Sequence, residues 1–428
     1  MTTLTTDLMS PAFKTAAAPA REHGASEPSA QPASPEGMTG QNVICFAKDW
    51  DENPTSNNHI MRLLARGNRV LWLNSIATRT PNLRDGRDLK KIVRKLVSFF
   101  RGPVHVENGL WVYTPVVLPF PHSRLATRLN SWILRASLAF IRRRLGLSGR
   151  FQLWVFIPTA SKYVGRLGES MVVYYVTDEY SKFSYVDGNE VAANDRAMCA
   201  QADVIFATAQ SLVDRRLPQN CETHLSRHGV DHAQFARALD PSTTVPSDLA
   251  ALPGPVLGFY GAIQDWLDFD LIEFLARRHP EWSIALIGPI LTDVSRLRAL
   301  PNVHFLGQKP HAQLPAYCKR LSVGLIPHKV NELTLNMNPI KLREYLSAGV
   351  PVVSVPLPEV EAYGDLCTIG RDYEQFERGV VEALRTDSPE ARRARSDGMR
   401  TETWDRRVAE IGREVMRVHE QISTGGKA

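Results

Sequence analysis

The chain has 428 residues, of which 43% are hydrophobic and 22% are charged, and it contains 27 Gly and 28 Pro. This balance is ordinary for a globular protein with two or three domains, and it excludes wholesale disorder and collagen. The five cysteines are scattered and show neither C-x-x-C nor Cys/His spacing, which excludes a disulfide scaffold and a zinc site and favours a reducing compartment.

The net charge of +6 is concentrated in one region. Residues 84–150 contain 14 Lys and Arg against three acidic residues, so this window carries +11 and the rest of the chain carries −5. We therefore expect an anionic partner to bind this region. The sequence has no apolar run of about 18 residues, and its polar start lacks an apolar signal segment, so we expect neither a membrane span nor export.

Residues 1–40 are rich in Ala, Ser, Pro and Thr and poor in large apolar groups, so we predict a disordered tail. An apolar run at 42–48, a helical pattern at 57–66 and a second apolar run at 69–74 are then typical of a βαβ unit. Further apolar runs, predicted to be buried parallel strands, lie at 151–157, 171–177 and 203–208. We assign residues 41–235 to a first, Rossmann-like domain with a basic amphipathic insert.

Residues 236–254 are rich in Pro, Ser and Thr and are predicted to be an interdomain linker. A second series of apolar runs, separated by helical segments, lies at 255–261, 282–288, 303–307, 322–327 and 350–355. The expected fold class is therefore α/β, with a second doubly wound, Rossmann-like domain at 255–402. The amphipathic helix expected at 403–422 can pack on either domain, including by crossing back to the first.

The most informative segment is NMNPIKLREYLSAGVPVVSV, at 336–355. Asn338 is a good N-cap, Pro339 suits the first helical position, and Gly349 suits the position after the last turn. These residues predict one short helix at 339–348 that leads into a strand.

The first turn of this predicted helix carries Lys341 and Arg343, although the helix dipole favours acidic residues there. A phosphate bound by the backbone N–H groups would explain the basic residues. A pair between Lys341 and Glu344, three residues later, explains them equally well. Gly261, at the carboxyl end of an apolar run, is a second indication of a ligand, although glycine is also common in ordinary βα turns.

Six motifs follow one another along the chain: RHGVD, FYGAIQDWLDFDLI, LIGP, NVHFLG, GLIPH and NPIKLREYLSAGVPVV. Through them the sequence resembles the nucleotide-sugar glycosyltransferases of the GT-B fold, and most of all the family 4 type that builds bacterial polysaccharides and lipid-linked oligosaccharides. The resemblance covers residues 42 to about 420. It implies two Rossmann-like domains that face each other across a cleft, with the nucleoside diphosphate sugar bound by the second.

The resemblance also implies roles for the residues that match the family motifs. Glu344 would accept hydrogen bonds from the ribose hydroxyls, which suits an acceptor-only carboxylate, and Lys341 would neutralise the diphosphate. The resemblance implies three further groups of donor-binding residues. Gly261 and Ala262 would form the loop against the phosphates and the sugar, and Gly307, Gln308 and Lys309 would lie at the edge of the nucleobase. Asn338 and Pro339 would bind the donor at the start of the helix.

One position departs from the family pattern. A second glutamate usually stands eight residues before Glu344, where this sequence has Asn336. An amide can hydrogen-bond sugar hydroxyls, but it cannot balance an oxocarbenium charge. The sequence therefore leaves open whether transfer retains or inverts the anomeric configuration, and an inverting enzyme needs a general base.

In this fold the acceptor chemistry belongs to the first domain. Asp178 follows the apolar run at 171–177, at the sheet edge where α/β proteins bind ligands, and could take the proton of an acceptor hydroxyl. Glu179 is its neighbour and rival, and a capping role for Asp178 is the alternative. Asp51 is a third candidate, in an acidic loop that lacks the G-x-G-x-x-G fingerprint of nicotinamide enzymes. We expect His228 to be a core or hinge histidine.

Two segments of the basic window have the pattern of interfacial helices, with apolar residues at helical spacing beside basic ones. The first spans 88–100 and the second 125–145, and their basic residues include Lys90, Lys91, Arg94, Lys95, Arg142 and Arg143. An anionic inner-leaflet surface attracts such residues by about 1 kcal/mol each. A core helix with a solvated basic face is the alternative. Nucleic acid is disfavoured, because no helix-turn-helix, zinc or RRM signature is present.

The sequence thus predicts a glycosyltransferase that moves a sugar from a nucleoside diphosphate, UDP rather than GDP, to a lipid-linked or polysaccharide acceptor. We expect it to act at the cytoplasmic face of the plasma membrane, as in exopolysaccharide biosynthesis, without a cofactor or a metal. One alternative is a nucleotide-sugar epimerase on the same double fold. Another is a catalytically silent nucleotide-sugar or membrane-binding assembly protein, which the presence of Asn336 favours.

Overall fold

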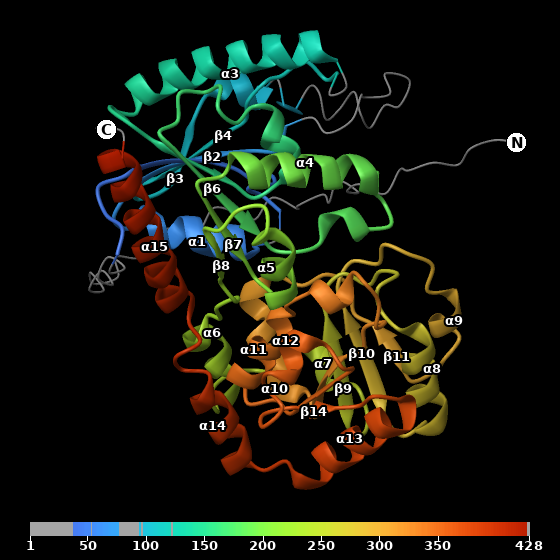
Figure 1. Cartoon of the computed structure of the whole chain (residues 1–428). Helices are drawn as coiled ribbons and strands as arrows, with labels where there is room; N and C mark the ends of the chain where they lie inside the picture. Colours follow the sequence, from blue (N-terminus) through green and yellow to red (C-terminus); the bar gives the residue numbers. More distant parts are fainter. Residues whose placement is uncertain (1–36, 53, 77–93, 96, 121–122, 426–428) are drawn as a thin grey trace, which may run out of the picture.

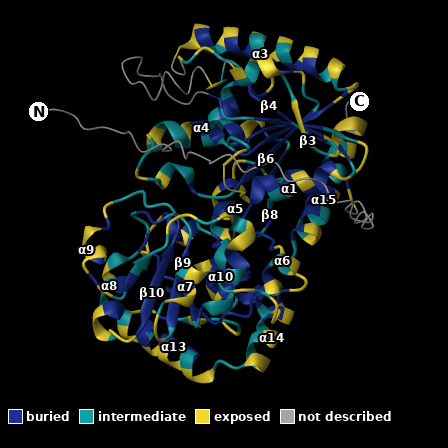
Figure 2. Cartoon of the chain, turned by 180° about the vertical axis from the view of Figure 1, so that it is seen from behind, coloured by how far each residue is buried: buried dark blue, intermediate teal, exposed yellow. Residues whose placement is uncertain are grey.

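The computed structural model describes residues 37–52, 54–76, 94–95, 97–120 and 123–425. These residues form two α/β domains, one above the other in Figure 1, and each domain is built around one sheet. The strands are mostly buried between helices, as the dark blue interior of Figure 2 shows. This confirms the predicted fold class of two doubly wound domains.

The first domain has an eight-stranded sheet in the order β3-β4-β2-β1-β5-β6-β7-β8, parallel except for the β3–β4 pair. Its strands are β1 (Asn42–Phe46), β2 (Arg69–Leu73), β3 (Val104–Glu107), β4 (Leu110–Tyr113), β5 (Gln152–Val155), β6 (Met171–Val176), β7 (Val204–Ala207) and β8 (Thr223–Leu225). Its helices are α1 (Ser56–Ala65), α3 (Arg124–Arg144), α4 (Gly188–Gln201) and α5 (Gln210–Arg216), with the short 3-10 helices η1 (Pro158–Lys162) and η2 (Tyr180–Lys182).

The two faces of the first sheet are covered by different helices, and β1 shows the division. Ile44 and Phe46 pack with buried residues of α3 and α4, whereas Val43 and Cys45 pack with α1 and the last helix, α15 (Trp404–Gly425). Successive side chains of a strand point to opposite faces, so a strand covered on both faces reads as a continuous apolar run. This is why the sequence predicted β1 and its parallel neighbours.

The second domain has a parallel sheet of six strands in the order β11-β10-β9-β12-β13-β14. Its strands are β9 (Val256–Tyr260), β10 (Ser283–Ile287), β11 (Val303–Phe305), β12 (Val323–Ile326), β13 (Val352–Ser354) and β14 (Thr368–Ile369). Its helices are α6 (His232–Ala236), α7 (Ser247–Ala250), α8 (Phe269–Arg278), α9 (Ser295–Arg298), α10 (Leu314–Arg320), α11 (Ile340–Ser347), α12 (Pro358–Glu361), α13 (Tyr373–Thr386) and α14 (Pro389–Gly398), with η3 (Arg237–Leu239), η4 (His311–Gln313) and η5 (Thr334–Asn336).

The chain crosses between the domains twice, and the two crossings lie side by side. Val230 forms a parallel bridge with Thr403, and its N–H donates to the carbonyl O of Glu402 at 2.8 Å. This close approach of the two crossings requires glycine at position 229, because a Cβ on Gly229 would lie only 2.5 Å from the backbone N of Trp404. After the return crossing, α15 packs on α1 of the first domain (Figure 1).

The predicted linker at 236–254 is wrong. Ala238 and Leu249 are buried in the core of the second domain, together with Phe235 of α6, so the chain already belongs to that domain there. Proline and serine in this stretch mark turns between short helices rather than a free connection. The predicted tail also ends earlier, because Met38 is buried in the first domain; residues 1–36 lie outside the described part of the chain.

Among the described residues, no helix combines the length and the hydrophobicity that a membrane crossing requires.

A buried glutamate joins the two domains next to the first crossing. Glu359 of α12 is 3% exposed. One carboxylate oxygen accepts from the backbone N of Gln210, at the start of α5, at 2.7 Å, and the other accepts from Nε of Arg227 at 2.6 Å. A carboxylate is favourable at a helix start, because it balances the dipole and uses an otherwise unpaired N–H.

We predict that Glu359→Ala lowers the free energy of unfolding by about 3 kcal/mol, because it leaves Arg227 and a helix N-terminus without their acceptor. Glu361→Ala is the matched control, since that carboxylate lies on the same helix but pairs at the surface with Arg371. The control substitution should lower the free energy of unfolding by less than about 1 kcal/mol. Urea denaturation followed by tryptophan fluorescence measures both, and equal costs would contradict the role of Glu359.

Candidate functional site

The candidate site lies where the carboxyl ends of the two sheets face each other. In the first domain Asp178 follows the end of β6, and in the second domain Gly261 follows the end of β9. Asp178 lies close enough to Lys341 of α11 for their charges to interact. The carboxyl ends of parallel strands are where α/β proteins bind ligands, which makes this junction the candidate ligand site.

Lys341 lies at the centre of this junction. Its Nζ is 5.4 Å from the ring centroid of Phe259, and a Cβ placed on Gly261 would lie 2.9 Å from the same Nζ. Burial lowers the pKa of Lys341, while the carboxylates of Glu344 and Asp178 favour its charged form. A partly buried cation in the first turn of a helix can bind a phosphate together with the helix backbone.

The helix that carries Lys341 begins one residue later than predicted. Its N-cap residue is Pro339, and no side chain caps it. Asn338 instead joins the domains: its Nδ2 donates to the carbonyl O of Thr208 at 2.6 Å, and its Oδ1 accepts from Arg343 at 2.7 Å. The predicted Asn338 cap is therefore wrong, and the start of α11 offers backbone N–H groups without a competing side-chain acceptor.

Arg343 is structural rather than part of an anion site. It is fully buried, its guanidinium lies 4.9 Å from the ring centroid of Tyr363, and it donates to the Tyr363 hydroxyl at 2.9 Å. Its Nε lies 3.7 Å from Glu402, at the return crossing. Of the two basic residues in the first turn, only Lys341 contacts Gly261.

Glu344 follows Lys341 on the same helix and is 4% exposed. Its Oε1 is 3.0 Å from Nε2 of His311, and the hydroxyl of Tyr260 lies beside the same carboxylate. His311 begins η4, so it connects Glu344 with the loop that follows β11. His311 was not among the residues predicted from the sequence, because a single histidine in a loop belongs to no motif.

The loop after β11 contains the residues predicted for the nucleobase edge. Gly307 and Gln308 are exposed, and Gly307 has a φ of +70° with no atom within 4 Å of the place that a Cβ would occupy. Lys309 is held by an ion pair, since its Nζ lies 2.7 Å from Asp248. Through His311, this loop does reach Glu344.

Asn336 ends η5 and is 2% exposed. Its Nδ2 donates to the carbonyl O of Glu332 at 2.5 Å, while its Oδ1 is buried without a hydrogen-bond partner among the described residues. A buried acceptor without a donor is unfavourable. The amide at this position therefore presents an unpaired oxygen, which a hydroxyl group could satisfy.

The three base candidates have different surroundings. Burial raises the pKa of Asp178, while a hydrogen bond to Thr177 and the charge of Lys341 oppose this shift. Glu179 is 7% exposed and lies 3.6 Å from the buried Arg216, so it belongs to an ion pair inside the first domain. Asp51 is exposed after β1, and no interaction among the described residues connects it with Lys341. Of these three candidates, only Asp178 interacts with Lys341 of the second domain.

His228 lies at the first crossing, not in the site. Its Nδ1 is 3.0 Å from Oγ of Ser56, it is 7% exposed, and burial lowers its pKa to about 3. It therefore stays neutral and packs beside Trp404, as a hinge residue does. His59, which belongs to none of the sequence motifs, also stacks on Trp404, with ring centroids 5.1 Å apart.

The basic surface of the first domain is described only in part. Lys90 and Lys91 lie outside the described residues. Arg94 and Arg143 are exposed, whereas Lys95 lies 3.2 Å from Oγ of Ser75 and Arg142 lies over the ring of Phe151, 4.4 Å from its centroid. The basic residues of the two segments are therefore not equivalent, since some also have a structural role.

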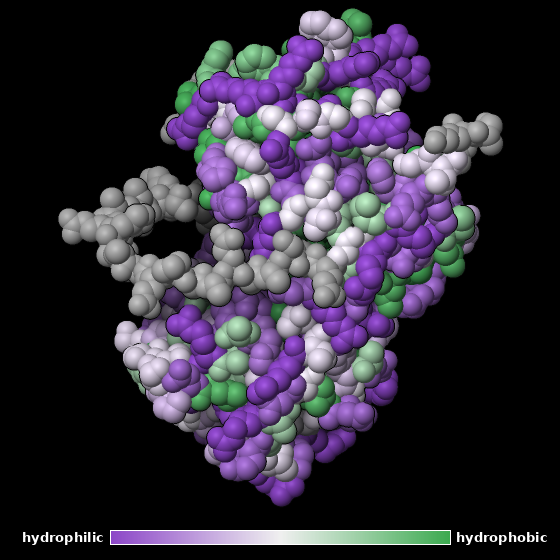
Figure 3. Space-filling model, turned by 90° about the vertical axis from the view of Figure 1, so that its left-hand side faces the viewer, coloured by the Kyte–Doolittle hydropathy of each residue, from purple (hydrophilic) through white to green (hydrophobic). Residues whose placement is uncertain are grey.

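Helix α3 exposes apolar and basic side chains on one face. Its buried stripe includes Leu134 and Leu138, while Trp132 is 69% and Phe140 is 66% exposed. The exposed face also carries Arg124, Leu125, Arg128, Leu129, Arg135, Arg143 and Arg144. In Figure 3 hydrophobic and hydrophilic side chains lie close together at the top of the molecule, where α3 lies.

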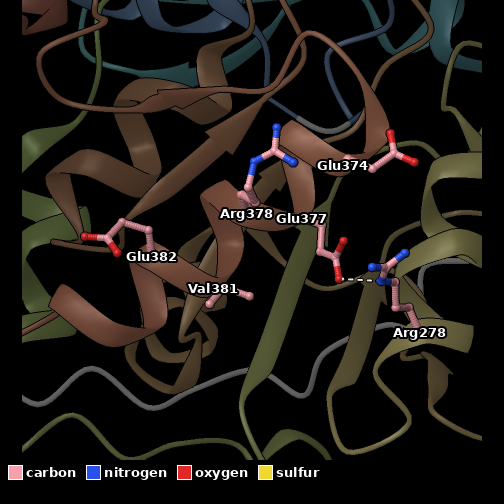
Figure 4. A pocket seen from close by; sticks show the side chains of 6 residues that line it. All are labelled: Arg278, Glu374, Glu377, Arg378, Val381 and Glu382. Carbon is pink, nitrogen blue, oxygen red and sulfur yellow. Dashed lines mark ion pairs between the residues drawn. The ribbon is translucent and has the colours of Figure 1, made fainter.

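Elsewhere, a shallow hollow lies between α8 and α13 of the second domain (Figure 4). It is lined by Arg278, Glu374, Glu377, Arg378, Val381 and Glu382. Arg278 and Glu377 pair across it at 2.8 Å, and it contains none of the predicted site residues. In the part of the chain that the structure describes, no group of three or more His, Cys, Asp or Glu is placed to hold a metal ion.

A known protein resembles part of this chain in sequence. No protein-family model matches the sequence. A Bacillus subtilis (strain 168) protein named "Putative teichuronic acid biosynthesis glycosyltransferase TuaH" is 35% identical over 167 residues, which are 37% of this chain and 41% of that protein. The match thus spans less than half of the relative's length.

Two solved structures cover nearly the whole chain. A sucrose-phosphate synthase from Thermosynechococcus elongatus has a TM-score of 0.62 at 12% identity, over 89% of this chain and 99% of that one. Anabaena HepE in complex with UDP and glucose has a TM-score of 0.55 at 14% identity, over 90% of this chain and 99% of that one. These are glycosyltransferases of the GT-B fold, so the chain has the GT-B fold that its sequence predicted.

We predict that Gly261→Ala lowers the free energy of unfolding by about 3 kcal/mol. Gly261 has a φ of +138°, and a Cβ there would lie 2.5 Å from Cε of Lys341, so the substitution strains the backbone and displaces the lysine. Gly165→Ala is the control, because Gly165 has a φ of +76° but no atom within 4 Å of the added carbon. Urea denaturation followed by tryptophan fluorescence should show the larger loss of stability for Gly261→Ala, and equal losses would contradict the contact with Lys341.

Proposed function

We propose that the protein is a glycosyltransferase that transfers a sugar from a nucleoside diphosphate, with UDP favoured, to a hydroxyl of a lipid-linked or polysaccharide acceptor. One observation carries the proposal. On a GT-B fold, Lys341 lies at the uncapped start of α11 beside Gly261, and it interacts with Glu344 of its own helix and with Asp178 of the other domain. The likeness to TuaH in sequence supports the same activity.

The second domain binds the donor in this proposal. The diphosphate receives charge from Lys341 and hydrogen bonds from the first backbone N–H groups of α11, and Gly261 allows it to approach closely. Glu344 accepts the ribose hydroxyls. Because these groups balance the phosphate charge, we expect binding without a metal or other cofactor. The unpaired Oδ1 of Asn336 would accept a hydroxyl of the transferred sugar.

The first domain supplies the general base. Asp178 comes from the carboxyl end of β6 and faces Lys341 across the junction. As a carboxylate it would take the proton from the acceptor hydroxyl while the oxygen attacks the anomeric carbon, and the nucleoside diphosphate would leave. Its raised pKa makes it a stronger base than an exposed aspartate.

The acceptor is placed at a membrane in this proposal. Leu125, Leu129, Trp132 and Phe140 of α3 are 45–76% exposed, and arginines alternate with them. Such a face lies in the interface of an anionic bilayer, with the apolar groups inserted and the arginines at the headgroups. An epimerase has no need of such a face. The exposed face of α3 therefore favours a transferase that works on a membrane-borne acceptor on the cytoplasmic side.

Turnover of a panel of nucleotide sugars by the purified protein tests the activity, and Asp178→Asn tests the base. We expect Asp178→Asn to lower kcat by a factor of about 100 to 10,000 and to retain UDP binding. The base must be deprotonated, so kcat/KM should fall as the pH falls through the raised pKa of Asp178. This decline should be lost in the variant.

Two results would contradict the proposal. If no nucleotide sugar is bound or turned over, the protein is not a glycosyltransferase. If Asp51→Asn lowers kcat more than Asp178→Asn does, the base is assigned to the wrong residue.

The membrane face has its own test. Replacing Trp132 and Phe140 together by Glu should lower binding to vesicles that contain anionic phosphatidylglycerol by at least about tenfold, because two large apolar side chains no longer insert. Val381→Glu is the control, since Val381 is 45% exposed on α13 of the other domain. Vesicle sedimentation measures the bound fraction. Equal sedimentation of all three proteins would rule out α3 as the membrane face.

A further inference from the structure

Glu344 does not stand alone in the donor site, because three side chains from separate elements form a hydrogen-bonded series. Nε2 of Gln234, on α6, lies 3.2 Å from Nδ1 of His311 and 3.1 Å from the carbonyl O of the same residue. On the other side of the ring, Nε2 of His311 lies 3.0 Å from Oε1 of Glu344. The sequence separates these residues by 77 and 33 positions.

The two contacts of Gln234 determine which nitrogen of His311 carries the proton. The atom that faces the carbonyl O of His311 must be a donor, since an oxygen there would meet another oxygen. The amide of Gln234 therefore donates, and Nδ1 of His311 accepts. The proton of the neutral ring is then on Nε2, which donates to Glu344.

The ring of His311 is also fixed in its plane. It packs edge-on against Phe235, with ring centroids 5.5 Å apart, and it lies 6.0 Å from the ring of His59 in the first domain. The Nε2–H group of His311 therefore points in one fixed direction, and its hydrogen bond uses one of the two carboxylate oxygens of Glu344. A carboxylate has acceptor sites on both oxygens, so Glu344 can accept a ligand hydroxyl in addition to His311 and the neighbouring Tyr260 hydroxyl.

We infer that His311 is a positioning residue which, held by Gln234, orients Glu344 toward the ribose hydroxyls and so sets the preference for a ribonucleotide over a deoxyribonucleotide. This inference rests on the proposed function, because it requires a nucleoside diphosphate in the site. Without His311, the buried carboxylate loses its donor and its fixed orientation, and a ribose 2′-hydroxyl loses its acceptor.

The test compares the affinities of the full chain for UDP and 2′-deoxy-UDP by isothermal titration calorimetry. We expect the unaltered protein to prefer UDP by at least about tenfold, since the 2′-hydroxyl bonds to a charged acceptor. His311→Ala should reduce this preference to about twofold or less. His311→Gln should keep most of it, because an amide N–H can take the place of the Nε2 donor.

His279→Ala is the matched control. His279 also donates toward a carboxylate, with Nε2 2.7 Å from Oε1 of Glu377, and its side chain is 19% exposed against 22% for His311. Glu377 lines the hollow of Figure 4, which contains none of the predicted site residues. The control should keep the full preference for UDP, so a loss confined to His311→Ala cannot come from general destabilisation.

A double-mutant cycle separates positioning from an independent effect. If His311 acts through Glu344, adding His311→Ala to Glu344→Gln should reduce the preference for UDP little further, because the charged acceptor is already gone. Losses that multiply, or a preference for UDP that persists in His311→Ala, would overturn the inference. Failure of the unaltered chain to bind UDP would instead overturn the proposed function, and this inference with it.

Discussion

The junction between the domains depends on one constraint, the partial burial of the Lys341 ammonium group. Removal of this charge from water is unfavourable, and burial does lower its pKa. Glu344, on the same helix, and Asp178, from the first domain, offset that cost. Because one of the two carboxylates comes from each domain, the charge on Lys341 is best stabilised when the domains face each other as they do here. An anionic ligand beside Gly261 would stabilise the same charge.

The segment around Lys341 contacts the first domain and the return crossing. Just before α11, Asn338 bonds to Thr208 of the first domain, and within it Arg343 lies against Glu402 at the return crossing. The two crossings between the domains lie side by side at Val230 and Thr403. A ligand at the start of α11 would therefore lie beside contacts that join the two domains.

The sequence predicted the parallel strands, because a strand covered on both faces is a continuous apolar run. It did not predict the β3–β4 hairpin, although Asn108 and Gly109 stand between two alternating segments, the usual hairpin signal. It placed Lys341, Glu344 and Gly261 together only through family resemblance. It could not find His311 or the bridge from Asn338 to Thr208, since both depend on contacts across 33 and 130 positions that no local pattern encodes.

The first domain forms one packing unit from its surface helix to the junction. Leu138 of α3 and Val176 of β6 belong to the same buried cluster, so the exposed face of α3 and the position of Asp178 are fixed relative to each other. The groups proposed to bind the donor all lie on the second domain. If the proposed function is right, a membrane-held acceptor meets a base on a rigid unit, while the donor arrives on a unit joined to it by two adjacent crossings. In the proposed function, this division would account for the +11 window in the first half of the chain, apart from the lysine proposed to bind the diphosphate.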